Sequence, residues 1–225
     1  MGEIFTNSML KDWKQCKQKY YYKYAKKIVI PKKEENFELG KKVHALVSYK
    51  LNNFDTTLLE NNANEDVKEH YFSILRHPLL KQIPYKAEWG FSVAIGNSED
   101  LFVGRVDAIF YDELTNKYTI ADWKTGMNIP KIAQFDSQAQ IYSYAFYKCR
   151  KDLKLNIKPE DISFKFIQTP SLKESSLDFS EQLLEAFEID FLQTIAQIRS
   201  YKHNKVAQEH SGCKFCEYRF LCFKN

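Results

Sequence analysis

The sequence lacks several features that would place it in common classes of protein. Its 225 residues contain no apolar run long enough to cross a membrane, and residues 1–6 lack the basic and apolar blocks of a secretory signal. There is no internal repeat, no low-complexity linker and no Gly-x₄-Gly-Lys-Ser/Thr loop, so no ATP-driven motor of that class is encoded. We therefore expect one domain over residues 1–225, located in the cytoplasm (the host cytoplasm if the source is viral) and not bound to membranes.

Acidic residues are scarce near the N-terminus, where residues 11–33 contain nine lysines and one acid, Asp12. Four tyrosines, at positions 20, 21, 22 and 24, are interleaved with these lysines. Lysines for phosphates combined with aromatic rings for bases are typical of nucleic-acid binding, and Lys14, Lys17 and Lys19 are candidate contacts. A solvated helix face with its tyrosines in the core fits the same pattern, so the segment alone leaves both interpretations open.

The spacing of apolar residues predicts a mixed α/β layer fold. We expect helices at residues 8–24, 37–51, 65–75, 135–148 and 180–201, and strands at 85–95, 102–111, 117–123 and 161–168. Residues 52–64 are expected to form a loop.

Two of these strands, 102–111 and 117–123, flank a polar turn and predict a hairpin. If the turn is centred between Leu114 and Thr115, Asp107 lies opposite Asp122, and alternation places Lys124 on the same side as Asp122. Two carboxylates facing each other across a sheet repel, and a hard divalent cation between them would remove that cost. An ordinary hairpin with solvated charges is the alternative for this pattern taken alone.

The five cysteines include a terminal trio spaced Cys213-x₂-Cys216-x₅-Cys222, which a distant fourth ligand, Cys16, would complete. Clustered thiols in a chain of cytosolic character favour a metal over disulfides. Spacing alone does not separate structural zinc from an iron–sulfur cluster, and unrelated buried thiols remain the alternative. Cys149 lies on an apolar helix and is expected in the core.

Six motifs in a single order resemble the PD-(D/E)XK nuclease superfamily, in its RecB-like iron–sulfur exonuclease branch. That branch includes the C-terminal nuclease of AddB and the nuclease that accompanies CRISPR adaptation. In chain order the motifs are Ser8-x-Leu-x₂-Trp-x₂-Cys-x₂-Lys-Tyr-Tyr-Tyr-x-Tyr24, Gly40-x₃-His44, Gly104-x-Val-Asp107, Asp122-x-Lys124-Thr-Gly126, Gln138-x₃-Tyr142 and Cys213-x₂-Cys216-x₅-Cys222.

The resemblance implies a restriction-endonuclease-like core, a mixed β-sheet flanked by helices, over about residues 37–200. It implies that Asp107, Asp122, the Trp123 carbonyl and His44 bind Mg²⁺ or Mn²⁺. Glu88, which precedes the hairpin as an acid often does in that family, would join the catalytic group.

For the remaining motifs the resemblance implies roles in water activation, DNA binding and cluster binding. Lys124 would position or activate the attacking water, and Gln138 and Tyr142, which share a helix face, would lie near the DNA strand. The four cysteines would hold a [4Fe–4S] cluster in a lobe formed by about residues 8–30 and 203–225, joining the two ends of the chain.

The function implied by this resemblance is a metal-dependent deoxyribonuclease, an exonuclease on single-stranded DNA ends with 5′→3′ polarity by analogy. DNA repair, recombination or CRISPR adaptation would be its setting. A helicase or a recombination or adaptation protein would be a partner, because the chain has no motor motif. The alternatives are a non-catalytic iron–sulfur DNA-binding module and a zinc-stapled interaction protein.

Overall fold

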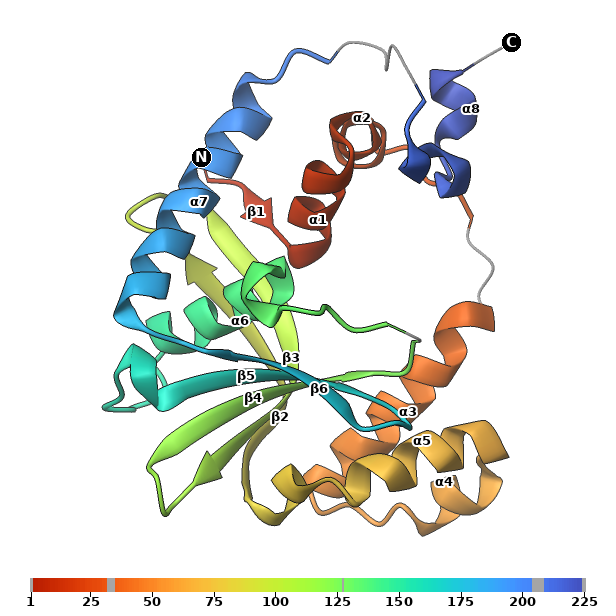
Figure 1. Cartoon of the computed structure of the whole chain (residues 1–225), viewed down its shortest axis with the longest axis vertical. Helices are drawn as coiled ribbons and strands as arrows, with labels where there is room; N and C mark the ends of the chain where they lie inside the picture. Colours follow the sequence, from red (N-terminus) through yellow and green to blue (C-terminus); the bar gives the residue numbers. More distant parts are fainter. Residues whose placement is uncertain (1, 32–34, 127, 204–208, 224–225) are drawn as a thin grey trace.

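The computed structural model describes residues 2–31, 35–126, 128–203 and 209–223, and it has a mixed α/β fold (Figure 1). The strands are β1 (Ile4–Phe5), β2 (Ile83–Ala94), β3 (Leu101–Asp112), β4 (Lys117–Lys124), β5 (Ile162–Gln168) and β6 (Lys173–Asp178). The α-helices are α1 (Asn7–Gln15), α2 (Lys17–Tyr20), α3 (Glu35–Leu51), α4 (Thr57–Asn62), α5 (Glu65–Leu75), α6 (Ser137–Lys148), α7 (Glu181–Ser200) and α8 (Arg219–Cys222). A π-helical turn, η1 (Tyr21–Ala25), and the 3₁₀ turns η2 (Pro78–Lys81), η3 (Ala133–Phe135), η4 (Pro159–Asp161) and η5 (Ser211–Phe215) complete the described elements.

The sheet has six strands and is centred on the β3–β4 hairpin. β3 and β4 pair antiparallel with Ala108 opposite Ala121 and Asp112 opposite Lys117, which confirms the register predicted from the turn. β4 pairs parallel with β5, and β5 pairs antiparallel with β6. The sheet is therefore mixed, as expected.

One edge of β3 is left partly unpaired. β2 pairs along the opposite edge from Leu101 to Tyr111, so β1 and β4 share the remaining edge. β1 occupies it at Leu101 and Phe102, and β4 occupies it from Ala108 onward. In the part of the chain that the structure describes, no strand pairs with this edge over residues 103–107.

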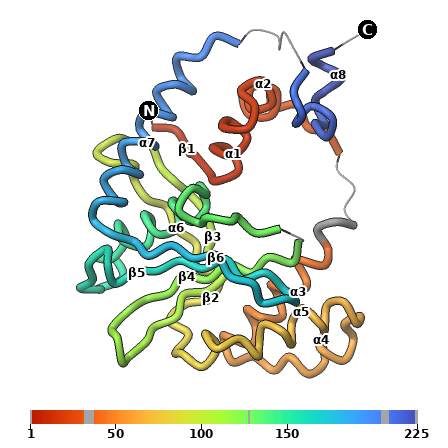
Figure 2. The backbone as a smooth tube through the Cα atoms, in the orientation of Figure 1, coloured from red at the N-terminus to blue at the C-terminus, as the bar shows by residue number. Residues whose placement is uncertain are grey.

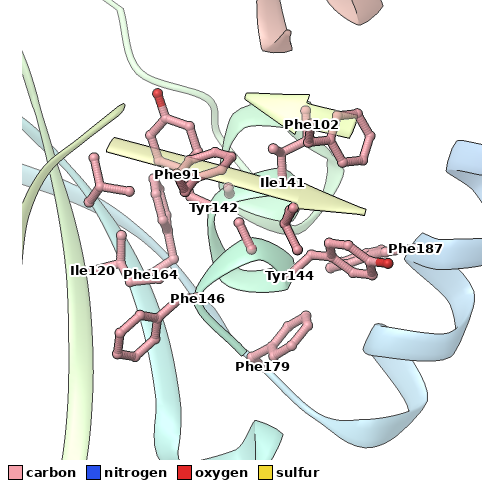
Figure 3. Close-up of a cluster of buried hydrophobic side chains, with 14 of the residues drawn as sticks. Phe91, Phe102, Ile120, Ile141, Tyr142, Tyr144, Phe146, Phe164, Phe179 and Phe187 are labelled. Carbon is pink, nitrogen blue, oxygen red and sulfur yellow. The ribbon is translucent and has the colours of Figure 1, made fainter. Parts of the chain in front are cut away.

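The two faces of the sheet carry separate hydrophobic cores. On one face, aromatic side chains of α6 pack against the strands and α7, as the cluster around Phe91, Tyr142, Phe146 and Phe164 shows (Figure 3). On the other face, α3 and α5 cover a cluster that includes Trp123. Full burial of a large apolar side chain contributes about 1.5–3 kcal/mol, so these two layers fix the hairpin between them.

The N-terminal helix differs from the single helix predicted over residues 8–24. It starts earlier, because the Thr6 side chain accepts the Met9 amide as the N-cap, and it breaks at Cys16, whose φ of −162° is extended. β1, β6 and α4 were not predicted from the sequence, and α4 lies within a segment predicted to be a loop. None of the helices in the described ranges is long and apolar enough to cross a membrane.

Candidate active site

The site lies where β3 and β4 separate, beyond the last paired residues Ala108 and Ala121. Beyond this point a side chain links the two strands, because Asp107 Oδ2 accepts a hydrogen bond from the Trp123 backbone amide at 2.8 Å. The carboxylate thus terminates the β-ladder and stays half-buried at the rim of the sheet. Two adjoining groups of side chains are built around it.

His44 of α3 forms the first link to Asp107. Its Nδ1 lies 3.2 Å from Asp107 Oδ1, and its Nε2 lies 3.0 Å from the Trp123 carbonyl oxygen. Both ring nitrogens face acceptors, which favours the doubly protonated ring. Burial alone would lower the pKa of His44, but the hydrogen bond to Asp107 and the charges of Asp107 and Asp122 raise it to about 9.

Glu88 of β2 completes a group of three ligands with His44 and Asp107. One ligand atom from each of the three lies within 4.8 Å of the others. Glu88 has a positive φ of 51°, an uncommon backbone conformation for a residue with a side chain. Burial and the Asp107 charge raise the pKa of the Glu88 carboxyl, against the opposing effect of Arg105. The two carboxylates supply the oxygen ligands that Mg²⁺ and Mn²⁺ prefer, and the imidazole adds a nitrogen donor.

Asp122 belongs to a second group, with Lys124 and Gln138. Lys124 Nζ lies 2.5 Å from Asp122 Oδ1 and donates to Gln138 Oε1 at 2.9 Å, and Gln138 Nε2 donates to Asp122 Oδ2. Asp122 is only 2% exposed, and burial and the Asp107 charge raise its pKa against the opposing charge of Lys124. The buried Oδ1 faces the Lys124 ammonium, so a metal ion at this atom would share the carboxylate with Lys124 or displace it.

Tyr142 lies one helical turn after Gln138 on α6 and is mostly buried. Its ring packs edge-on against Phe91 and Phe164 (Figure 3). The structure therefore gives Tyr142 a packing role in addition to its place beside Gln138.

The three candidate DNA-binding lysines lie on α1 and α2, and each has a partner within the protein. Lys14 pairs with Asp190 at 3.1 Å, and Lys17 lies over the Trp13 and Tyr201 rings. Lys19 pairs with Asp12 at 3.0 Å and has a side chain only 16% exposed. Lys14 and Lys17 keep exposed side chains, whereas the side chain of Lys19 is mostly covered where it pairs with Asp12.

The four clustered cysteines line one cavity of about 100 Å³, between the α1–α2 junction and the C-terminal segment. They are Cys16, Cys213, Cys216 and Cys222, the set that the sequence analysis grouped. α8 lies beside α2 in the fold, so segments about 200 residues apart meet there (Figure 2). Cys149 is buried in the core at the end of α6, and residues 204–208 and 224–225 of the predicted lobe lie outside the described residues.

Arg105 was not predicted from the sequence, and its Nη1 lies 3.3 Å from Glu88 Oε2. The available signal was position, because Arg105 precedes Asp107 by two residues on the same strand, and alternate residues share a face. Its charge is exposed next to the candidate metal ligands.

A profile of the PD-(D/E)XK nuclease superfamily matches residues 5–223, almost the whole chain. The chain belongs to this superfamily. Its mixed sheet with flanking helices agrees with the restriction-endonuclease-like core expected of such a nuclease, and members of the superfamily generally use divalent metals.

Two solved structures are similar to this PD-(D/E)XK protein. One, titled as a candidate exonuclease from Eubacterium rectale, has 9% identity and a TM-score of 0.52, covering 93% of this chain and 86% of that one. The other, named SSO0001, has 16% identity and a TM-score of 0.46, covering 97% of this chain and 85% of that one. The first likeness supports the fold. No curated protein sequence matches the chain.

Proposed function

We propose that this PD-(D/E)XK protein is an Mg²⁺- or Mn²⁺-dependent deoxyribonuclease. The observation that carries the proposal is the convergence of His44, Glu88 and Asp107, directly beside the buried pair of Asp122 and Lys124. A non-catalytic binding module would have no need for a buried carboxylate that destabilises the fold unless it is neutralised.

The ligands proposed for the cation are His44, Asp107, Glu88, Asp122 and the Trp123 carbonyl. When bound, the cation would offset the negative charge on the phosphate and on the attacking oxygen. His44 must give up its extra proton for this, because a protonated ring offers no lone pair.

Lys124 and Gln138 act as a positioning pair in this proposal. Gln138 holds the ammonium of Lys124 on one side and the carboxylate of Asp122 on the other. Lys124 is 32% exposed, so its ammonium can reach solvent and hold the attacking water or steady charge on the phosphate.

By the family resemblance, the substrate is a single-stranded DNA end, and hydrolysis is exonucleolytic with 5′→3′ polarity. DNA repair, recombination or CRISPR adaptation is the proposed setting. Because the sequence contains no phosphate-binding loop of the motor type, opening of a duplex falls to a helicase or to another recombination or adaptation partner.

We propose further that the four cysteines hold a [4Fe–4S] cluster. A tetrahedral zinc site with Zn–S bonds of about 2.3 Å brings its sulfurs to about 3.8 Å from one another. In the described ranges, the group of ligand atoms within 4.8 Å of one another is His44, Glu88 and Asp107, and no cysteine trio meets that limit. The thiols would therefore have to approach each other to bind a single zinc ion, and the choice of a cluster rests on the family resemblance.

The test is cleavage of end-labelled single-stranded DNA with Mn²⁺, with and without a chelator. We expect wild-type protein to release short products only with the metal, and Asp107→Asn to lose at least about 10³-fold in rate while remaining folded. Wild-type rates in Asp107→Asn would overturn the site. Binding without cleavage by wild-type protein would favour the non-catalytic module, and one zinc per chain without iron would refute the cluster.

A further inference from the structure

The unpaired edge of β3 opens into a groove of about 870 Å³ that leads away from the candidate site. Its lining comes from the start of α1, from the facing middle portions of β2 and β3, and from α6. The lining residues are Thr6, Asn7, Ser8, Gly90, Phe91, Ser92, Val103, Gly104, Arg105, Gln138 and Tyr142.

The walls of this groove are fixed to each other and to the site. Ser137 Oγ donates to Asn7 Oδ1 at 2.6 Å, which ties the start of α6 to the start of α1. Gln138 lines the groove and also bonds to Asp122 and Lys124. The groove therefore opens directly onto the two groups of side chains proposed to carry the chemistry.

The floor of the groove contains a close packing contact between β2 and β3. A Cβ atom on Gly104 would lie 2.6 Å from the ring of Phe91, its register partner on β2. Phe91 in turn packs against Tyr142. A side chain at position 104 would therefore displace the Phe91 ring, which packs directly over the glycine.

The charge of the lining suits a polyanion. Arg105 is its one basic side chain, it is 70% exposed, and the lining contains no acidic side chain. Asn7 and Ser8 add polar side chains at the opposite wall. Backbone groups of an unpaired strand edge and such side chains are the usual partners of sugar and phosphate oxygens.

We propose that this groove guides one strand of nucleic acid into the site, with its sugar–phosphate backbone along the unpaired edge of β3 and the Ser8 wall. The proposal rests on the nuclease function proposed above. The volume lies within the ~300–1,000 Å³ of small-ligand sites, which suits a nucleotide or two of a single strand. The strand would have to separate from its complement before it enters.

The test is the binding of a fluorescein-labelled 20-nucleotide thymidine strand in chelator, measured by anisotropy with Ser8→Glu. We expect Ser8→Glu to bind at least about fivefold more weakly, because its carboxylate faces the strand across the groove. Its melting temperature should be equal or higher, because an acidic residue in the first turn of α1 is favourable. A role in the groove predicts weaker binding with an equal or higher melting temperature. A folding defect would lower both binding and melting temperature.

The matched control is Gln182→Glu, which places the same charge on an exposed position in the first turn of α7, outside the groove lining. We expect it to bind within about twofold of wild type, and a blunt hairpin duplex to bind wild type more weakly than the single strand. Equal affinity of Ser8→Glu and wild type, or duplex bound as tightly as the single strand, would overturn the proposal. If the protein binds the strand through the groove but does not cleave it with Mn²⁺, the proposed nuclease function is refuted and the groove proposal stands.

Discussion

Asp107 shows how one side chain serves both the sheet and the site. Its Oδ2 accepts the Trp123 amide, and its Oδ1 faces His44. One oxygen of the same carboxylate also lies within 4.8 Å of a ligand atom of Glu88. Truncating Asp107 to Ala therefore removes a strand contact along with a ligand, whereas Asn keeps an oxygen that can accept the Trp123 amide. The carboxylate of Asp122 is held by the side chains of Lys124 and Gln138.

Asp122 is the residue whose replacement should stabilise the metal-free protein. Its pKa is raised by burial and by Asp107, so keeping it ionised near neutral pH costs folding free energy. We expect Asp122→Asn to raise the melting temperature at pH 7.5 in chelator by several degrees, since ~1 kcal/mol corresponds to about 2–4 °C at this size. The same variant should lose cleavage. A lower melting temperature would contradict the assignment of Asp122 as a strained buried carboxylate.

His44 gives the metal-free protein a predicted pH dependence. Its folded pKa of about 9 lies above the ordinary value near 6.5, so its contribution is complete below pH 6.5 and is lost as pH rises through 9. Melting curves in chelator should therefore fall from pH 6.5 to 9.5, and fall less steeply for His44→Gln. With Mn²⁺ the trend should weaken or reverse, because the ligand must be deprotonated. Parallel curves for the two proteins would return His44 to a packing role.

At the scale of elements, the hairpin was predictable because its register follows from the turn. A polar stretch at 112–116 between two apolar strands fixes which residues face each other, and with them the placement of Asp107 beside the end of β4. α5 was also predicted with its observed ends, because Asn64 caps it and its apolar residues repeat at helical spacing. The same local rules located β5 and the long helix α7 to within a residue or so.

The missed elements lack such local signals. β6 has only Leu177 as a large apolar residue, because it is an edge strand with one solvated face. α4 contains no buried residue, and β1 is too short to show a period. The break at Cys16 has no signal in the local sequence, which contains neither Gly nor Pro there and is compatible with one continuous helix. Grouping Glu88 with His44 likewise depends on β2 lying beside β3, which no local pattern encodes.

Asp12 holds the α1–α2 segment together from within. Lys23 Nζ donates to it at 2.6 Å, Lys19 Nζ lies at 3.0 Å, and the Tyr24 hydroxyl donates at 2.9 Å. Burial raises the pKa of Asp12, but these hydrogen bonds outweigh burial and hold the pKa below its ordinary value. The scarce acid of this segment therefore organises the lysines that surround it.

Replacing Asp12 should be costly, because it leaves two ammonium groups without their shared acceptor. We expect Asp12→Asn to lower the free energy of unfolding by about 2 kcal/mol in denaturant titrations at pH 7. The difference from wild type should shrink as pH falls below about 4, where Asp12 itself becomes protonated. Asp190→Asn, which removes the exposed partner of Lys14, should change stability by less than ~0.5 kcal/mol. Equal effects of the two variants would refute a structural role for Asp12.

At the scale of the whole molecule, the cysteine cavity joins the two ends of the chain. Cys16 is supplied near the N-terminus, and the other three thiols follow residue 212. The Tyr218 hydroxyl donates to the Ile28 carbonyl oxygen at 2.8 Å, which adds a second tie between the same two segments. A metal centre at this cavity would make the folding of both ends depend on each other.

Cys16→Ser and Cys213→Ser should therefore have matching effects, although the two residues are far apart in sequence. We expect each to lose the brown colour, most of about four irons per chain, and a large part of the stability. Cys149→Ser, in the core and away from the cavity, should retain both colour and iron. Iron analysis and thermal melting make the comparison, and a coloured, stable Cys16→Ser protein would break the link between the chain ends.

The pairing of β1 with β3 has a consequence for how the chain folds as it is made. Ile4 pairs with Leu101, so the first strand leaves the ribosome long before its partner exists. The delay is longer for Cys16, because the three cysteines that share its cavity are made only with the segment that ends near Cys222. At synthesis rates of about 5–20 residues per second, this delay is roughly 10–40 s. Until β3, α6 and the C-terminal segment have been made in turn, the lysine- and tyrosine-rich N-terminal segment lacks partners that it has in the fold. It is therefore the part of the nascent chain most open to premature contacts with nucleic acid or with chaperones.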